Sequence, residues 1–259
     1  MQMLDILPPE ILLLIGYNLS VEEILNMEKV SKFFLKFIRQ TPWNHFVVNV
    51  FDLIKLEIHH PFANNFIITF VKNHHFKKYN FAGCRKISVE IIQQLNGINT
   101  INLLGCQADM DVALKDFKCD KINLSHCPNV SDRTLESLQC SNIYLNNCIK
   151  VTDMALKYLS KCKMVSLIGC PQITDVGVSH LKNCQNLCIG GQNNITDKIF
   201  EYIQNCKVLR LEFCQTITDN GIQKLLNCQH LTIMYCPQIT LSCVQELQKK
   251  GQIVYYQYM

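Results

Sequence analysis

Cysteine recurs in this chain at a regular interval, which constrains the fold more than any other feature of the sequence. Seven cysteines are separated by 21 or 22 residues, with one double interval in which Gln192 fills the vacant position. They are Cys84, Cys106, Cys127, Cys148, Cys170, Cys214 and Cys236. Six more follow this series by 13 or 14 residues: Cys119, Cys140, Cys162, Cys184, Cys206 and Cys228. Self-similarity at such a period predicts a solenoid whose repeats are stabilised by packing on their neighbours.

The residues before each cysteine of the first series alternate in character. The shared phrase is apolar-x-apolar-x-x-Cys, and its copies begin at Ile101, Ile122, Ile143, Val165 and Leu209. Alternation with a period of two over so short a run predicts a strand with one buried face.

The residues after each cysteine change to a helical pattern. Thr174 and Asp175 offer a helix cap and, in the first turn, a carboxylate that faces the positive end of the helix. Val178, Leu181 and Cys184 then recur at every third position, as one apolar stripe of a short helix does. Each repeat is therefore expected to run strand, corner, helix and return.

We interpret the periodic cysteines as structural thiols. A strand that ends at a buried corner leaves amides and carbonyls that need partners, and a small side chain with a weak S–H donor fits there. Structural zinc sites pair ligands about two to four residues apart and redox motifs need Cys-x-x-Cys, which this spacing does not offer. A thiol-dependent metal or redox protein remains the rival interpretation. In the vacant repeat, Gly190 and Gly191 precede Gln192, and we expect the ladder of strands to loosen or bulge there.

Over about residues 79–259 the pattern resembles the cysteine-containing subclass of leucine-rich repeats, in phrases such as Val165-Ser-Leu-Ile-Gly-Cys-Pro-Gln-Ile-Thr-Asp. The resemblance implies about eight repeats in an α/β horseshoe, with a parallel sheet on the concave face and short helices outside. One departure is that the segment between the helix-end cysteine and the next strand, as at Gln185 and Asn186, is shorter than in the family. The curvature is therefore expected to differ from that of the relatives.

Residues 1–46 have no repeat and predict three short helices. Pro8 and Pro9 suit a helix start, and apolar residues follow them at helical spacing up to Leu19. Ser20-Val-Glu-Glu23 forms a capping box that predicts a second helix over 24–30, and a third is expected over 31–39. Three helices with this much apolar surface make too small a core to be stable alone.

This N-terminal segment resembles an F-box, from Leu7-Pro-Pro-Glu to Trp43. The matching positions that the resemblance assigns to adaptor binding are Leu7, Pro8, Ile11, Ile15, Leu19, Ile24, Leu25, Val30, Phe34 and Trp43. Two departures are Phe33-Phe34 in place of the usual Arg-Trp and a stretch before Trp43 that is one residue short.

The two resemblances together imply a substrate-recognition adaptor of an SCF-type cullin-RING ubiquitin ligase. The F-box would dock onto the SCF adaptor and cullin complex, and the repeats would hold a protein substrate. Two alternatives stay open: the apolar residues of the N-terminal segment pack onto the first repeat, or the chain is an interaction scaffold without a ligase.

Residues 47–78 predict a degenerate capping repeat or linker. Residues 47–50 could form a strand and residues 62–71 a helix that covers the apolar end of the solenoid. His59-His60 and His74-His75 lack a spaced cysteine or carboxylate partner, so we expect solvent-facing neighbours rather than metal ligands.

Substrate recognition is expected on the concave sheet, at the positions that alternate with the buried ones. Tyr144, Arg210, Met234 and Tyr256 are the predicted contact residues, because tyrosine, arginine and methionine are over-represented at interfaces.

Composition excludes several other functions. Of 25 basic residues, 21 are lysine and none forms a basic run, so nucleic-acid binding is not expected. Apolar runs are too short for a membrane helix, and the acidic residues near the N-terminus do not fit a secretory signal, so we expect a chain inside a cell, cytoplasmic or nuclear, including an infected host cell. Phosphate-loop, zinc-protease and serine-hydrolase motifs are absent, so the sequence predicts a binding module without a cofactor, a metal or enzymatic activity.

Overall fold

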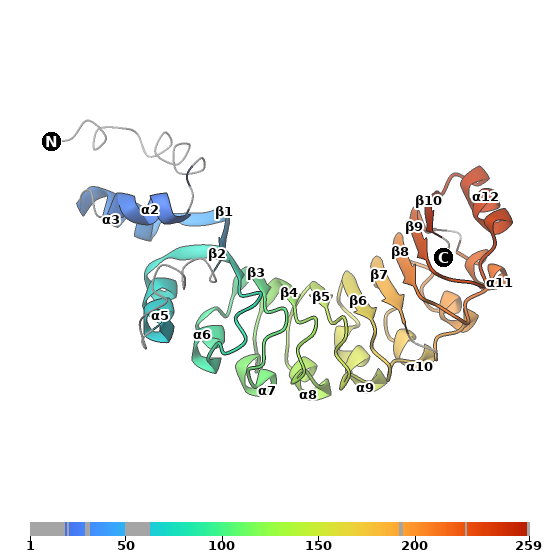
Figure 1. Cartoon of the computed structure of the whole chain (residues 1–259), viewed down its shortest axis with the longest axis horizontal. Coiled ribbons are helices and arrows are strands. Elements are labelled where there is room, and N and C mark those ends of the chain that lie inside the picture. Colours follow the sequence, from blue (N-terminus) through green and yellow to red (C-terminus); the bar gives the residue numbers. More distant parts are fainter. Residues whose placement is uncertain are drawn as a thin grey trace.

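The repeats form one continuous curved sheet. The structure, a computed structural model, describes residues 19, 21–28, 32–49, 63–191, 194–225 and 227–257. Ten strands lie in sequence order, and each pairs in parallel with the next. They are β1 (Pro42–Asn49), β2 (His75–Asn80), β3 (Ile98–Asn102), β4 (Cys119–Asn123), β5 (Asn142–Tyr144), β6 (Met164–Ile168), β7 (Asn186–Gly190), β8 (Val208–Glu212), β9 (His230–Met234) and β10 (Ile253–Gln257). The strands line the inner side of an arc (Figure 1). The horseshoe expected from the repeats is confirmed.

Short helices connect the strands along the outer side of the arc (Figure 1). They are α6 (Val89–Gln94), α7 (Met110–Ala113), α8 (Asp132–Glu136), α9 (Asp153–Leu156), α10 (Asp175–Val178), α11 (Asp219–Ile222) and α12 (Leu241–Lys249), with 3₁₀ helices η2 (Lys157–Leu159) and η3 (Asp197–Glu201). Most are a single turn, because each repeat leaves few residues for the return to the next strand. A Thr or Ser side chain caps several of them, as Thr174 does by accepting from Val176 N.

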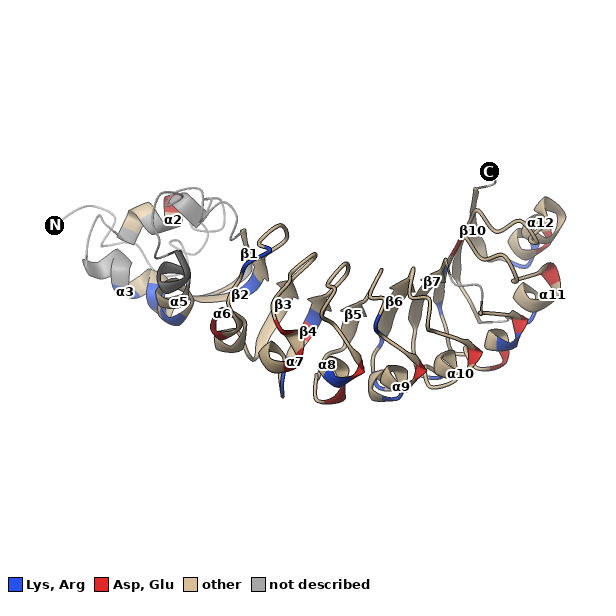
Figure 2. Cartoon of the chain, turned by 60° about the horizontal axis from the view of Figure 1, so that its bottom comes forward, with Lys and Arg blue, Asp and Glu red and all other residues tan. Residues whose placement is uncertain are grey.

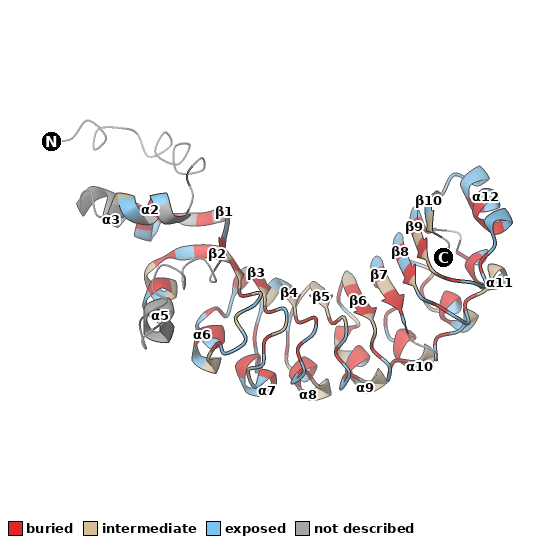
Figure 3. Cartoon of the chain, viewed as in Figure 1, coloured by how far each residue is buried: buried red, intermediate tan, exposed pale blue. Residues whose placement is uncertain are grey.

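The core lies between the sheet and these helices (Figure 3). The apolar positions of the strand phrase, such as Val165 and Leu167, are fully buried. The helical stripe Val178, Leu181 and Cys184 is buried as well. Both periods in the sequence therefore identified the core-facing residues correctly.

A ladder of aspartate and threonine links neighbouring helices, which the sequence did not reveal. Each Asp in the first turn of one helix accepts hydrogen bonds from the main-chain N–H and the hydroxyl of the Thr before the next helix, and the N–H bond is 2.8 Å long in every case. The pairs are Asp132–Thr152, Asp153–Thr174, Asp175–Thr196, Asp197–Thr218 and Asp219–Thr240. We call this the Asp–Thr ladder. Acidic residues accordingly recur along the outer helices in Figure 2.

The corner cysteines have the structural role expected of them. Cys127, Cys148 and Cys170 are fully buried. Their Sγ atoms donate to main-chain carbonyls of the preceding repeat at 3.1, 3.2 and 3.0 Å, respectively. Each of these carbonyls also accepts a main-chain N–H within its own repeat, so the thiol adds a second hydrogen bond that joins two repeats.

The vacant repeat is not loosened at its strand, contrary to expectation. β7 keeps five consecutive pairs with both β6 and β8. A Cβ on Gly190 would lie 1.8 Å from the carbonyl oxygen of Glu212, so only glycine lets the two strands approach this closely. Gln192 itself lies outside the described residues.

The N-terminal part joins the sheet through β1. Helices α2 (Val21–Glu28) and α3 (Lys32–Gln40) overlap the second and third expected helices, and β1 begins one residue after α3. The first expected helix, up to Leu19, lies outside the described residues apart from Leu19 itself. Helix α5 (Ala63–Asn73) precedes β2, close to the helix expected over 62–71. Strand β1 begins before residue 47, so it crosses the expected boundary between residues 46 and 47.

His74 is not solvent-facing, and that expectation was wrong. Its side chain is 6% exposed, its Nδ1 lies 2.8 Å from the carbonyl oxygen of Phe70, and the two rings stack at 4.4 Å. It lies between α5 and β2, where the chain turns toward the core. His75 is exposed, and His59 and His60 lie outside the described residues.

In the described part of the chain, no helix is both long and apolar enough to cross a membrane.

Candidate functional site

The inner surface of the sheet is the candidate binding surface, and strand register defines its central row. Directly paired residues run from β2 to β10 as Asn80, Asn102, Asn123, Tyr144, Ser166, Cys188, Arg210, Thr232 and Tyr255. The row therefore changes at β5 from uniform asparagine to side chains of varied chemistry.

The asparagines at the N-terminal end of this row serve the fold. Asn102 Nδ2 donates to Asn80 Oδ1, and Asn80 Nδ2 to Asn49 Oδ1, both at 2.9 Å. Their Oδ1 atoms, and that of Asn123, also accept the main-chain N–H two residues further on. Because these amides already bond within the chain, they have less capacity left to recognise a partner.

Tyr144 opens the more varied part of the row. Its ring is half-buried, and Lys121 Nζ from the preceding strand lies 5.0 Å from the ring centroid, in a cation–π arrangement. The structure thus places Tyr144 on the concave face, as expected.

Arg210 and Met234 are brought together three and four strands away from Tyr144. Arg210 pairs through Nε with the carboxylate of Glu212, and its Nη2 lies 3.5 Å from Met234 Sδ. Arg210 is exposed, whereas Glu212 and Met234 are half-buried. These two expected contact residues form one patch, and Tyr144 stands apart from it.

Tyr256 does not face the concave side, and that expectation was one residue out of register. It pairs with the buried Ile233 and packs partly against the core, with its hydroxyl 2.9 Å from the carbonyl oxygen of Ile239. The outward residue is Tyr255, which pairs with Thr232 and is 59% exposed. The shift arises because α12 is a nine-residue helix, longer than the single turns of the earlier repeats.

The residues expected to bind an adaptor fall into three groups. Ile24 and Trp43 are 0% and 1% exposed and belong to the chain's own core, while Leu19 packs partly against it. Leu25 and Phe34 lie in α2 and α3. Outside the described residues are Leu7, Pro8, Ile11, Ile15 and Val30.

Trp43 packs between the N-terminal helices and the sheet and connects the two. Its Nε1 donates to the carbonyl oxygen of Ile38 at 2.9 Å, and its ring packs edge-on against Phe37 and stacks at 6.2 Å with Phe76 on β2. This burial gives Trp43 a packing role inside the chain.

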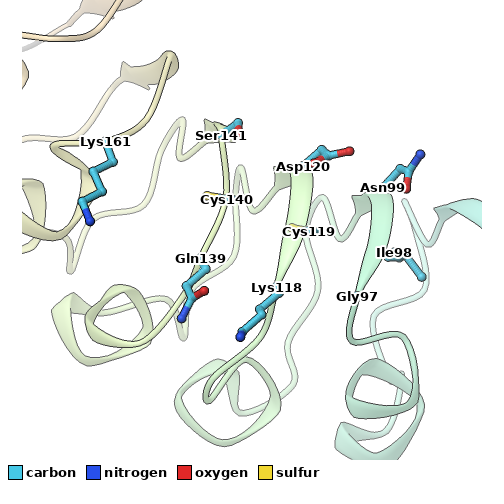
Figure 4. Close-up of a pocket in the computed structure, with 10 residues that line it drawn as sticks. All are labelled: Gly97, Ile98, Asn99, Lys118, Cys119, Asp120, Gln139, Cys140, Ser141 and Lys161. Atoms are coloured by element: carbon cyan, nitrogen blue, oxygen red, sulfur yellow. The ribbon is translucent and has the colours of Figure 1, made fainter.

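A shallow hollow of about 440 Å³ lies where β3, β4 and β5 begin (Figure 4). It is lined mainly by polar and charged side chains, including Asn99, Lys118, Asp120, Gln139 and Lys161. It therefore lacks the apolar walls typical of small-molecule sites.

The thiols carry little reactive character. All fifteen cysteines are free, and burial raises the pKa of Cys170 to about 11 and that of Cys127 to about 12. Hydrogen bonds from Cys140 and Cys214 lower the pKa of Cys162 and Cys236, but these two side chains are only 3% and 1% exposed. Within the described ranges, no group of three or more His, Cys, Asp or Glu side chains is placed to hold a metal ion. The geometry thus favours packing over thiol chemistry.

Comparison with known proteins gives only distant likenesses. No family model matches the sequence. No curated protein matches it either. Similar solved structures include internalin C2 from Listeria monocytogenes, at 24% identity and a TM-score of 0.49, covering 65% of this chain and 75% of that one.

Two further solved structures are more distant in sequence. A chain of the Rad7 and Elc1 complex in yeast is 12% identical over 93% of this chain and 89% of that one, with a TM-score of 0.44. The internalin inlF from Listeria monocytogenes is also 12% identical, over 74% of this chain and 72% of that one, with a TM-score of 0.43. The assignment of a repeat solenoid therefore rests on the strand register and repeat spacing of this chain itself.

Proposed function

We propose that this chain is a substrate-recognition adaptor of an SCF-type cullin-RING ubiquitin ligase. In this role residues 1–46 dock onto the SCF adaptor and cullin complex, and the concave sheet binds a protein substrate. The sequence motif at Leu7 to Trp43 motivates the first half of the proposal. The ligase role places the chain in the cytoplasm or nucleus of a eukaryotic cell, either its own or that of an infected host.

The observation that carries the proposal is the packing of Trp43 between the N-terminal helices and the sheet. A substrate receptor must hold its protein substrate at a fixed position relative to the enzyme that transfers ubiquitin. This requires a rigid connection between the docking unit and the binding surface. Trp43 bonds to the end of α3 and stacks on Phe76 in the second strand, and β1 continues α3 without a linker. This packing supports a docking unit and a solenoid that move as one body.

The burial of Ile24 and Trp43 narrows the set of motif residues that can contact the adaptor. Since both side chains pack inside the chain, they act by positioning the helices. Contact with the adaptor is then assigned to the remaining motif residues, above all Leu7, Ile11 and Leu25.

A protein-interaction scaffold without a ligase is the second candidate, and the concave surface favours it. The varied side chains from β5 to β10 suit protein contact whether or not the N-terminal helices bind an adaptor. This candidate shares the binding surface of the first and differs only in what residues 1–46 do.

Co-purification separates the two candidates. The full chain is co-expressed with the SCF adaptor and the N-terminal half of the cullin, and the complex is isolated by a tag on the chain and sized by gel filtration. The ligase role predicts a ternary complex with equal amounts of each component. A chain that elutes alone, folded by circular dichroism, leaves the scaffold as its function.

A further inference from the structure

The residue before each corner cysteine, and before Gln192 in the vacant repeat, adopts a left-handed backbone, and two repeats place Phe or Tyr there. Glycine fills this position at Gly83, Gly105, Gly169 and Gly191, with φ between 70° and 84°. Histidine or asparagine fills it at His126 and Asn147, while Phe213 and Tyr235 fill it with φ of 53° and 57°. Asparagine and histidine are enriched in this region, but a bulky aromatic residue there is an outlier.

This conformation is costly for the two aromatic residues. A non-glycine residue in the left-handed region costs roughly 1–2 kcal/mol, and such strain persists where the surrounding structure or a function maintains it. The rings of Phe213 and Tyr235 stack at 4.8 Å with an interplanar angle of 20°. Stacking offsets part of the strain, yet Phe213 remains 45% exposed, so burial within this chain does not account for the ring.

The stacked rings belong to a connected patch on the last three strands. Met234 Sδ contacts Arg210, Met234 O accepts from Phe213 N at 2.9 Å, and Gln257 donates to Tyr235 Oη at 2.7 Å. We call Arg210, Phe213, Met234, Tyr235 and Gln257 the corner patch. Arginine and tyrosine are the residue types most often found at energetically dominant interface positions, and methionine is enriched at interfaces.

Charge and hydrogen bonding indicate what this patch would bind. Glu212 neutralises Arg210, so a charged ligand would have to compete with that pair, while an uncharged one would not. Because Tyr235 Oη accepts from Gln257, its own proton is directed to another acceptor, and a peptide carbonyl fits that requirement. The exposed part of the Phe213 ring, beside the half-buried Tyr235, favours proline or another aliphatic side chain, as in aromatic-lined grooves that bind extended peptides.

We infer that the corner patch is the anchor site for an extended, uncharged peptide segment of the protein partner, with a proline or aliphatic residue seated on the rings of Phe213 and Tyr235. The inference rests on the proposed protein-binding function of the concave sheet, but not on the ligase role. It also accounts for the strain, since replacing either aromatic residue by glycine would relax the backbone and remove the anchor.

Selection from a random dodecapeptide library displayed on phage tests the inference with the full chain. The clones retained by the wild type should be enriched in proline and aliphatic residues and depleted in Asp, Glu, Lys and Arg. Their affinity should fall at least tenfold for Phe213→Gly and for Tyr235→Gly. Val176→Ala, at a 65% exposed apolar side chain on the outer helix α10, is the matched control and should bind them normally.

Thermal unfolding of the same variants separates binding from packing. The inference predicts that Phe213→Gly melts at or above the wild-type temperature, because glycine relieves the left-handed strain. A clear drop in melting temperature would show that the rings serve the fold and would overturn the inference. Failure to enrich any clone, enrichment of charged clones, or clones that bind the glycine variants equally would also overturn it. Adaptor capture, measured on the same preparations, tests the ligase role separately and should not change in Phe213→Gly.

Discussion

The carboxylate of Asp153 accepts two hydrogen bonds from Thr174, one from its main-chain N–H at 2.8 Å and one from its hydroxyl at 2.6 Å. The same arrangement recurs across five successive pairs of repeats. It ties the start of each helix to the start of the next, on the side of the solenoid opposite to the sheet. The Asp–Thr ladder therefore acts as a second line of inter-repeat bonds beside the sheet itself.

Asp153→Ala should destabilise the chain by about 2 kcal/mol, because hydrogen bonds to a charged acceptor are stronger than neutral ones and Thr174 N–H loses its partner. Asp153→Asn should cost less, since the amide oxygen still accepts one bond. Urea unfolding monitored by circular dichroism measures both. Lys182→Ala, an exposed side chain near the same repeats, is the control, and an equal effect from it would contradict the ladder's role.

Gly177→Ala should also destabilise the chain, because it disturbs the same Asp–Thr pair. A Cβ at this position would lie 2.2 Å from Asp153 Oδ1 and would displace the carboxylate from Thr174. The cost should shrink in the Asp153→Ala background, giving a coupling energy of about 1 kcal/mol in a double-mutant cycle. Additive effects would mean that the glycine is required for some other contact.

The buried thiols should make stability fall at alkaline pH. Burial raises the pKa of Cys170 to about 11 and that of Cys127 to about 12, so the folded chain keeps protons that the unfolded chain loses. Stability from these groups is fully present below the unfolded thiol pKa and is lost as the pH rises from there toward the folded values, by at most about 1.4 kcal/mol per thiol and pH unit.

Urea unfolding between pH 7.5 and 10.5, in the presence of a reductant, measures this linkage. The free energy of unfolding should decline with pH above the unfolded thiol pKa. Cys170→Ala should lower stability at neutral pH and flatten the decline, because one linked proton has been removed. An unchanged slope in that variant would contradict the assignment.

Tyr255 and Tyr256 should respond oppositely to substitution. Tyr256→Ala removes core packing and the hydroxyl bond to Ile239 O, and it should lower stability by roughly 2–3 kcal/mol. Tyr255→Ala removes a side chain that is 59% exposed and should change stability by less than about 0.5 kcal/mol. The reverse pattern in thermal unfolding would contradict this register and would indicate that Tyr256, as expected from the sequence, is the outward residue.

The repeat geometry could be predicted from the sequence because the same pattern of apolar and cysteine positions recurs in successive repeats. Strand positions, the buried phase of Val165 and Leu167, and the packing role of the corner cysteines follow from two overlapping periods. The prediction failed at β10, where the longer α12 breaks the period that placed Tyr256.

The contacts between repeats could not be predicted in the same way. Asp175 was expected to serve only its own helix end, because the sequence does not show which atoms of the next repeat lie within reach. The left-handed corners were hidden for a similar reason: Phe213 and Tyr235 look like ordinary loop residues until the backbone shows that they occupy a glycine position.

Binding of the purified SCF adaptor to the full chain is the most direct test of the proposed function. Isothermal titration of the wild type should show one site with a Kd of about 1 µM or tighter. Ile11→Asp combined with Leu25→Asp should abolish the signal without changing the melting temperature of the repeats, and Lys36→Asp, an exposed position on α3, should bind normally. Absence of binding by the wild type, or equal binding by the double variant, would contradict the ligase role.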